Sequence, residues 1–468
     1  MTQPIDRRSF LGASASLAVL AGLAPFAGAE PGVTGNDRPV ADAGSRARNL
    51  IFMVADGMSI GTFQLAQRAC ELEGRSSAWA ELIRTPGARS ALADTRSANS
   101  EVTDSAAAST AWSTGVRVDN GAVCVAPGGR TLTPLYHRVR ATGRRTGLVT
   151  TTRLTHATPA AFATVVDERS SEDDIAQQLL APGHDVLLGG GARYITDDRI
   201  AERSDRGVRV VRTARELAVE PARDGALLGV FADDHMVYEL DRGSTQQPSL
   251  AEMTRAALTR LSAPPAAGDE SPGFVLQVEG GRVDHAAHSC DAAALLRDQL
   301  AFDDAVRAAL DFAAERDDTL LIVTTDHGNA APSLTHYGPS KLGVLGRATA
   351  SFEVLLPQIE SAGPRVEASR LRLLVGRATG VALADDELAL FSRCLRGETV
   401  NAFEGMRAPA HVLGSLLANH SGVHFVSGAH TAEPALLTAF GPGADRIPPY
   451  AHLTDTHEAV AAALEFAS

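Results

Sequence analysis

Continuously apolar runs alternate with helix-period segments along this chain, and this alternation restricts the fold more than any other feature of the sequence. Strands of a parallel sheet covered on both faces show such runs, because both faces of each strand are buried. Five runs of this kind lie at residues 50–55, 147–151, 185–188, 274–278 and 319–324. Helical patterns lie at residues 59–73, 105–113, 132–141, 171–180, 250–261 and 291–315. Because the strand-like runs and the helical patterns alternate, we predict an α/β domain with a mostly parallel central sheet and helices on both faces.

Polar residues with metal-binding or acid–base chemistry follow the ends of the predicted strands. They are Asp56 after the first run, His156 and Thr158 beyond the second, Glu279 at the end of the fourth, and Asp326 and His327 after the fifth. Ligands of open α/β sheets bind beyond the carboxyl ends of the strands. The sequence therefore predicts that these side chains form one site at that edge of the sheet.

Ser105 is a candidate nucleophile because of its place in the sequence. It stands directly after Asp104 and heads a helical segment of small residues that ends at Gly115. The unpaired N–H groups and the positive dipole end of a helix N-terminus attract an anion. A serine in this position can attack phosphorus if a metal ion lowers its pKa. The alternative is an ordinary helix cap.

Several acids and histidines have the spacing of metal ligands. Asp284 and His288 are four residues apart, so they face one direction on a helical turn and suit zinc with an open position for substrate. Glu279 offers hard oxygen atoms of the kind that magnesium prefers. Asp56 can bridge two cations, and Asp326 forms an acid–imidazole pair with the residue after it. Helix or loop capping is the alternative for Asp56 and for Asp326.

A second polar segment combines nitrogen and oxygen ligands with a guanidinium group. His156 and Thr158 lie two residues apart, and Arg169 follows after an apolar stretch. A guanidinium can hold two phosphoryl oxygens at once. Near the C-terminus His430 precedes Thr431, but a lone histidine is more often structural than functional.

The overall charge bears on the class of partner. A net charge of −13 disfavours nucleic acid as a surface ligand, so positive charge for an anionic substrate must be created locally, for example by bound metal ions. Lys341 is the only lysine, so we expect the group that holds an anionic substrate to be arginine.

The 468 residues, 44% of them hydrophobic, allow a large core and an inserted lobe. We place this lobe at roughly residues 335–425, where residues 385–395 and 410–419 have helical patterns.

The first residues have the pattern of an export signal. Arg7 and Arg8 belong to a twin-arginine pattern, a modestly apolar stretch follows, and small residues up to Ala29 fit a cleavage site. The stretch is too short and too rich in Gly, Ala and Ser for a membrane span, and an uncleaved anchor is the alternative. We expect a twin-arginine signal peptide at residues 1–29, a linker at residues 30–48, and a periplasmic or secreted mature protein.

Four cysteines are spread along the chain, at Cys70, Cys124, Cys290 and Cys394. In an exported protein an even number of cysteines permits disulfides, and four allow three pairings, between which the sequence does not choose.

Taken together, these segments closely resemble the alkaline phosphatase family. The matching stretches occur in the family's order, at residues 56–58, 104–106, 155–160, 185–191, 278–288, 326–328 and 430–431. The resemblance covers residues from about 49 to 330 and again from 430 to the C-terminus. It implies the family's fold for a catalytic domain at residues 49–468.

The resemblance also implies a role for each site residue. Ser105 would be the phosphorylated nucleophile, and Arg169 would hold the non-bridging oxygens of the phosphate. Two zinc ions and one magnesium ion are implied, held by Asp284, His288 and His430, by Asp56, Asp326 and His327, and by Asp56, Thr158 and Glu279, with His156 beside the magnesium. The implied reaction is hydrolysis of a small phosphomonoester with release of phosphate. We expect no nucleic-acid partner and no membrane span after signal removal, and a homodimer is the candidate assembly.

Departures from the family pattern leave other functions open. Some family members carry Asp and Lys where this chain has His156 and His285, and a histidine there lets zinc compete with magnesium. A related sulfatase would need a C/S-x-P-x-R context, which Cys124 and Ser105 both lack. A related diesterase favours a threonine nucleophile and need not have Arg169. A non-catalytic periplasmic protein that binds phosphate or metal is the alternative from another class.

Overall fold

The computed structural model describes residues 46–204, 207–220, 225–264, 272–335 and 337–466. The predicted signal peptide and residues 30–45 of the predicted linker lie outside these described residues. Within the described part, no helix combines the length and apolar character that a membrane crossing requires.

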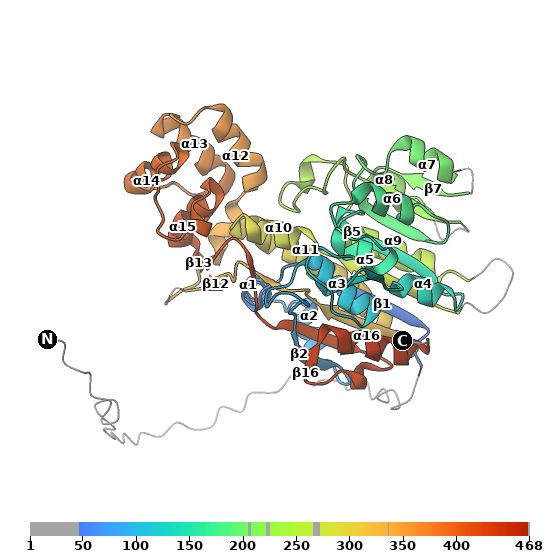
Figure 1. The fold of residues 1–468 in the computed structure, drawn as a ribbon. Coiled ribbons are helices and arrows are strands. Elements are labelled where there is room, and N and C mark those ends of the chain that lie inside the picture. The colour runs from blue at the N-terminus through green and yellow to red at the C-terminus, as the bar shows by residue number, and fades with distance from the viewer. Residues whose placement is uncertain (1–45, 205–206, 221–224, 265–271, 336, 467–468) are drawn as a thin grey trace, which may run out of the picture. The chain divides into compact units, whose positions relative to one another are not determined.

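A large, mostly parallel sheet forms the centre of the described chain (Figure 1). Its strand order is β16-β2-β15-β10-β1-β9-β5-β6-β8-β7. Neighbouring strands from β10 to β7 run parallel, whereas β15 is antiparallel to both of its neighbours. The strands are β1 (Asn49–Val54), β2 (Arg89–Asp94), β5 (Arg145–Arg153), β6 (Val186–Gly190), β7 (Arg209–Val211), β8 (Leu227–Val230), β9 (Phe274–Glu279), β10 (Thr319–Thr324), β15 (Ala435–Phe440) and β16 (Tyr450–His452). All the predicted strands are present, as β1, β5, β6, β9 and β10, and the predicted fold class is confirmed.

Three short strand pairs of the described residues lie outside the main sheet. They are β3 (Val125–Ala126) with β4 (Arg130–Thr131), β11 (Gly328–Asn329) with β14 (His430–Thr431), and β12 (Ser333–Leu334) with β13 (Val423–His424). The second pair brings the C-terminal part of the chain next to the residues that follow β10.

The register of the central strands brings the predicted site residues to one edge of the sheet. Strand β1 lies between β10 and β9, so that Val54 is opposite Thr324 on one side and Glu279 on the other. Parallel neighbours end at the same edge. Asp56 and Asp326, which follow β1 and β10, therefore lie beside the end of β9.

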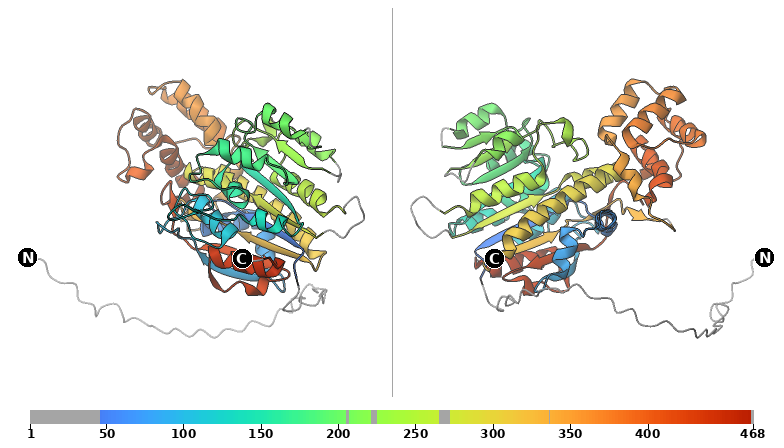
Figure 2. Two further views of the ribbon diagram at one scale, coloured as in Figure 1. Left: turned by 45° about the vertical axis from the view of Figure 1, so that its right-hand side comes forward. Right: turned by 180° about the vertical axis from the view of Figure 1, so that it is seen from behind.

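Helices cover both faces of the sheet, as the views from two further sides show (Figure 2). They are α1 (Ile60–Leu72), α2 (Ala78–Arg84), α3 (Ser105–Thr114), α4 (Leu135–Arg140), α5 (Ala157–Ala163), α6 (Glu172–Leu179), α7 (Asp197–Ser204), α8 (Ala214–Ala218), α9 (Leu250–Ser262), α10 (Arg282–His288), α11 (Ala292–Ala314) and α16 (Leu453–Leu464), with short 3-10 turns η1 (Arg242–Ser244) and η4 (Ala444–Arg446). Successive side chains of β1 point to opposite faces. Leu50 and Phe52 pack in one core with α3 and α5, and Ile51 and Met53 pack in the other with α9 and α11.

Helix α3 is buried along its whole length because its residues are small. Its three consecutive alanines after Ser105 let α5 and α16 approach closely. The side chain of Asp104 caps the helix by accepting a hydrogen bond from the Ala107 N–H, and Gly115 ends it in the left-handed conformation at φ 74°. The sequence prediction of a helix headed by Ser105 is confirmed.

A separate group of helices lies between two short strands, β12 (Ser333–Leu334) and β13 (Val423–His424), which pair with each other. We call this group the helical lobe (orange to red in Figure 1). It consists of η2 (Leu342–Arg347), α12 (Phe352–Ser361), α13 (Ala368–Thr379), α14 (Asp385–Leu395), η3 (Glu404–Met406) and α15 (Pro409–Ser421). Its apolar core, which includes Leu371, Phe391 and Leu413, is distinct from the two cores of the sheet. The two helices predicted in this interval are α14 and α15.

All four cysteines lie in the described part of the chain, and each is buried and free. None of the three disulfide pairings that the sequence permits is formed. Burial raises the pKa of the Cys124 thiol to about 12 and that of the Cys290 thiol to about 12.

Candidate active site

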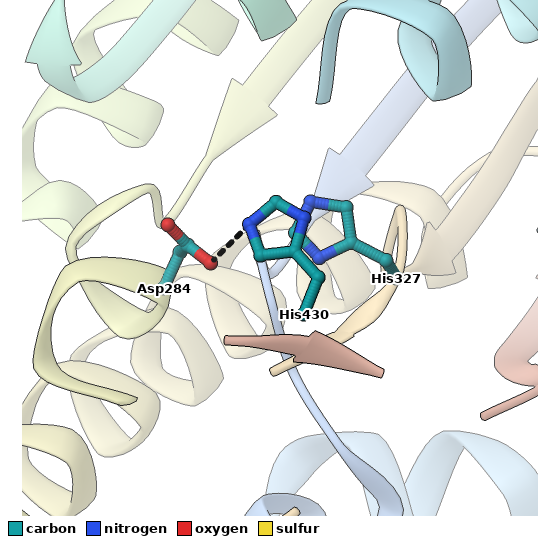
Figure 3. Close-up of side chains that lie close together, drawn as sticks. All are labelled: Asp284, His327 and His430. Carbon is teal, nitrogen blue, oxygen red and sulfur yellow. Dashed lines mark ion pairs between the residues drawn. The ribbon is translucent and has the colours of Figure 1, made fainter. Parts of the chain in front are cut away.

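Three side chains from separate elements meet beyond the carboxyl edge of the sheet. Asp284 lies on α10, His327 follows β10, and His430 lies on β14. Their potential ligand atoms are all within 4.8 Å of one another. Figure 3 shows the carboxylate of Asp284 pointing toward the His430 ring, with an Oδ1–Nε2 distance of 3.6 Å. The His327 and His430 rings stack, with their centroids 3.7 Å apart.

His288, the second predicted ligand on α10, lies against this group. Its Nε2 is 3.1 Å from Nε2 of His430 and 3.4 Å from Oδ2 of Asp284. Nδ1 of His288 donates to the Gly428 carbonyl, and Nδ1 of His430 donates to the Thr103 carbonyl. Both histidines therefore turn the lone pair of Nε2 toward the carboxylate. Facing lone pairs repel each other unless a cation lies between them.

Asp56, Asp326 and His327 form a second group, which is fully buried. Nε2 of His327 is 3.2 Å from Oδ2 of Asp326 and 3.7 Å from Oδ1 of Asp56. The same nitrogen is 3.4 Å from Oγ of Ser105, whose residue is only 2% exposed. The candidate nucleophile therefore borders this group directly.

The electrostatics of this group fit a bound cation. Burial raises the pKa of Asp56 well above its ordinary value, and repulsion from Asp326, Asp284 and Glu279 raises it further. Neither carboxylate oxygen of Asp56 has a hydrogen-bond partner. Burial lowers the pKa of His327 to about 4, so its ring is neutral and can offer a lone pair. Uncompensated buried carboxylates are costly unless positive charge balances them.

A third group shares Asp56 with the second. The ligand atoms of Asp56, His156 and Glu279 lie within 4.8 Å of one another. Like the two Asp56 oxygens, Nδ1 of His156 and Oε1 of Glu279 are buried without a hydrogen-bond partner, and so is Oγ1 of Thr158, two residues after His156. The donor set is mainly oxygen with one imidazole nitrogen. It can hold a hard cation such as magnesium, and the nitrogen also suits zinc.

Arg169 connects the third group to the serine helix. Its Nη1 donates to Oδ2 of Asp104 at 2.9 Å, and its Nη2 donates to Nε2 of His156 at 3.0 Å. Because Asp104 caps α3, these contacts hold the guanidinium beside the residue that precedes Ser105. The structure therefore brings Ser105, Arg169 and the predicted ligands other than Thr158 into one region, and Thr158 lies at the start of α5, two residues after His156.

Two further histidines, His235 and His285, lie beside His156. Sequence patterns did not single out His235, and they marked His285 only as a departure from the family pattern. Their ring centroids are 4.4 Å apart, and the His156 ring lies 5.6 Å from the first and 5.7 Å from the second. Burial lowers the pKa of His235 to about 2 and that of His285 well below its ordinary value, so both rings are neutral. The adjacency of His285 to Asp284 was a usable signal. His235 follows the short strand β8, which was not predicted, and nothing in its local sequence marks it.

Comparison with known proteins identifies the family. The model of the alkaline phosphatase family matches residues 47–466. The chain belongs to the alkaline phosphatase family. The resemblance stated from sequence motifs is thereby confirmed, and it extends through the helical lobe, where those motifs gave no match.

Individual alkaline phosphatases agree with this assignment. The crystal structure of Thermus thermophilus alkaline phosphatase has a TM-score of 0.81 and 35% identity, covering 92% of this chain and 93% of that one. Alkaline phosphatase 4 of Bacillus subtilis is 28% identical over 434 residues, which are 90% of this chain and 89% of the relative. The repressible alkaline phosphatase of Saccharomyces cerevisiae is 34% identical over 316 residues, covering 61% of this chain and 55% of the yeast protein. The match thus spans little more than half of the yeast relative. These relatives support the predicted phosphomonoesterase activity.

Proposed function

We propose that this protein hydrolyses phosphate monoesters through a phosphoserine intermediate at Ser105. The observation that carries the proposal is the position of Ser105 Oγ, at the N-terminus of α3 and 3.4 Å from Nε2 of His327. Arg169 donates a hydrogen bond to the neighbouring Asp104, and this contact holds its guanidinium near the helix terminus where an anion would bind. Membership of the alkaline phosphatase family supports the same reaction.

Two zinc ions and one magnesium ion are the proposed cofactors. They would be held, respectively, by Asp284, His288 and His430, by Asp56, Asp326 and His327, and by Asp56, Thr158 and Glu279, with His156 at the magnesium. When bound, these ions lower the pKa of the serine hydroxyl and of water, and they neutralise charge on the phosphoryl oxygens. The unpartnered buried atoms of Asp56, Thr158 and Glu279 support this assignment.

The chain's own residues then carry two displacement steps. In the first, Ser105 gives its hydroxyl proton to solvent water and Oγ bonds to phosphorus, while the bond from phosphorus to the leaving oxygen breaks and that oxygen takes a proton from solvent. In the second, a water molecule attacks phosphorus and gives up one proton, the Oγ–P bond breaks, and Oγ of Ser105 takes up a proton as inorganic phosphate leaves. The N–H groups at the start of α3 and the guanidinium of Arg169 stabilise the phosphoryl oxygens in both steps.

Acid-quenched turnover of p-nitrophenyl phosphate tests the proposal. Mass spectrometry of the quenched protein should find phosphate on the peptide that contains Ser105. Ser105→Ala should lose this signal and most of the activity, with a residual rate because positioning and electrostatics survive. Ser361→Ala, which removes an exposed hydroxyl from the helical lobe, is the matched control. Phosphate trapped on another residue of the active protein would contradict the assignment, and absence of turnover would favour a binding protein.

The N-terminal region has a proposed role of its own. We propose a twin-arginine signal peptide at residues 1–29, a linker at residues 30–48 and a catalytic domain at residues 49–468, with a lobe inserted at roughly residues 335–425. The mature protein would be periplasmic or secreted. Replacing Arg7 and Arg8 with lysine should leave the precursor in the cytoplasm, whereas unchanged secretion would point to another route.

A homodimer is the proposed assembly, supported by the family resemblance. Light scattering of the purified mature protein checks it, and a monomeric mass would contradict it.

A further inference from the structure

Helix α10 carries two of the proposed zinc ligands but is too short to hold its own position. It has seven residues, from Arg282 to His288, and its N-cap residue Gly281 offers no capping side chain. Helices of this length are not stable alone, because nucleation is costly and few hydrogen bonds repay it. The positions of Asp284 and His288 therefore depend on contacts from other elements. On the sheet side, Nδ2 of Asn329 donates to Oδ1 of Asp284 at 2.6 Å.

The helical lobe contacts the first residue of α10 through an ion pair. The Arg282 side chain is 4% exposed, and its Nη2 pairs with Oε2 of Glu353, in the first turn of α12. The Arg282 guanidinium also lies over the Tyr238 ring, 3.8 Å from its centroid. A buried guanidinium is costly without a carboxylate partner. The ion pair therefore fixes the start of α10 relative to α12.

A second lobe residue contacts the last residue of α10. Nε2 of His411, on α15, donates to the backbone carbonyl of His288 at 2.9 Å. This carbonyl is one of those that a helix C-terminus leaves without an intrahelical partner. The His411 ring also packs on Gly428, where a Cβ would lie 2.3 Å from Nε2. Because His288 donates from Nδ1 to the Gly428 carbonyl at 2.8 Å, His411 touches both partners of the hydrogen bond that orients the His288 ring.

Two more contacts join the lobe to the segment just after α10. The N–H of Phe352 donates to Oδ2 of Asp291 at 2.7 Å, and Gly414 packs against Cys290 so closely that a Cβ would lie 2.4 Å from its carbonyl oxygen. The lobe has its own apolar core, so it can act on α10 as a preformed body. It contacts both ends of the helix that carries Asp284 and His288.

We propose that the helical lobe acts as a clamp that positions the α10 ligand pair for the first zinc, with Glu353 and His411 as the positioning residues. This inference rests on the proposed function, because it requires a zinc ion at Asp284, His288 and His430. Neither Glu353 nor His411 is among the residues proposed to hold zinc or phosphate. Loss of either contact loosens one end of α10, so the zinc is released faster although all its ligands remain.

The rate of zinc release from the zinc-loaded full chain tests the clamp. Excess 4-(2-pyridylazo)resorcinol captures and reports the released zinc. His411→Ala and Glu353→Gln should each release the first zinc about tenfold faster than the natural sequence, at the low end of the effect of losing a residue that orients a metal ligand. His411→Gln keeps an N–H donor near the His288 carbonyl and should restore most of the slow release. Glu360→Gln, an exposed change on the same helix α12, should release zinc at the natural rate.

The outcomes separate the clamp from the proposed function. If the natural sequence binds no zinc, the proposed metal site itself fails. If it binds zinc and both His411→Ala and Glu353→Gln release it at the natural rate, the clamp alone is overturned. Equal acceleration by Glu360→Gln would show a general loosening of the lobe and would also overturn it. Melting temperatures of the metal-free variants identify any that do not fold. If His411→Ala does not fold, the clamp requires fast zinc release from Glu353→Gln and slow release from His411→Gln, and natural release from Glu353→Gln overturns it.

Discussion

Arg169 donates a hydrogen bond from Nη2 to Nε2 of His156, and this contact is incompatible with metal binding through the other nitrogen of the same ring. A neutral imidazole has one lone pair and one N–H. While Nε2 accepts from Arg169, Nδ1 carries the proton and faces Oε1 of Glu279, 3.9 Å away. Binding a cation through Nδ1 moves the proton to Nε2. Nε2 then becomes a donor and can no longer accept the hydrogen bond from Arg169.

We predict from this relationship that excess zinc depresses activity through His156. Imidazole binds zinc more readily than magnesium, so zinc should enter the third site and displace the Arg169 contact. Added magnesium should restore activity slowly as the ions exchange. His156→Asp should be much less sensitive. The measurement is a zinc titration of both proteins, with metal content determined alongside, and equal sensitivity would contradict the prediction.

Arg169 should favour monoesters over diesters. A monoester presents more charge and more free oxygens to a guanidinium than a diester does. Arg169→Ser should lower kcat/KM for p-nitrophenyl phosphate by the equivalent of about 1.5–3 kcal/mol, the scale of a hydrogen bond to a charged group. The same variant is assayed with bis-p-nitrophenyl phosphate. If diester turnover falls by the same factor, Arg169 does not discriminate.

Metal removal should destabilise the protein through Asp56. Both of its oxygens are buried without partners, and burial together with Asp326 and Asp284 raises its pKa. In the chelated protein, Asp56→Asn should raise the free energy of unfolding by about 1–3 kcal/mol, because it removes a buried carboxyl group that has no hydrogen-bond partner and lies among other acids. In the metal-loaded protein the same change should lower the melting temperature, because a ligand is lost. Urea and thermal unfolding measure both, and the same sign in the two states would refute the account.

Asp291 should make stability fall as the pH rises from about 4 to about 6. Burial raises its pKa to about 6, although three backbone N–H groups oppose the shift. The native state therefore binds the proton more tightly than the unfolded state, so the stabilisation is full below the ordinary pKa and is lost as the pH rises through 6. The span is about 3 kcal/mol. Urea unfolding of the metal-free protein should show this slope, and Asp291→Asn should reduce it, the remainder coming from other buried carboxyls with raised pKa values such as Asp56 and Asp298. Asp311→Asn, an exposed change on α11, should keep the slope, and a slope unchanged in Asp291→Asn would exclude this origin.

The buried centre of the sheet could be predicted from the sequence because its strands are apolar at every position. Strands β1, β9 and β10 are buried throughout, and their ends placed Asp56, Glu279 and Asp326 correctly. The strands on the far side of β10, toward β16, could not be predicted in this way. Residues of β2 alternate between exposed and buried, and Arg89 and Asp94 lie at its ends. Such strands are fixed by the neighbours they pair with, which the local pattern does not contain.

Sequence patterns pointed to most of the side chains that meet in the candidate site, but not to the contacts that support them. Asp284 and His288 have a helical spacing that can be seen in the sequence. Glu353 and His411 reach the same helix from more than sixty residues away, as the separations of 71 and 123 positions in their contacts show. A glutamate and a histidine on amphipathic helices carry no sign of such a contact. Only the tertiary structure reveals which elements hold α10.

The four free cysteines have a consequence for where the chain can fold. Because every thiol is buried in the finished structure and none is bonded to another, folding consumes no oxidant and requires no disulfide exchange. The native state can therefore be completed in a reducing compartment. Burial keeps the thiols of Cys124 and Cys290 protonated and poorly nucleophilic at neutral pH, so a later move to an oxidising compartment leaves them unchanged. This behaviour is compatible with the export of an already folded chain that we propose from its N-terminal sequence.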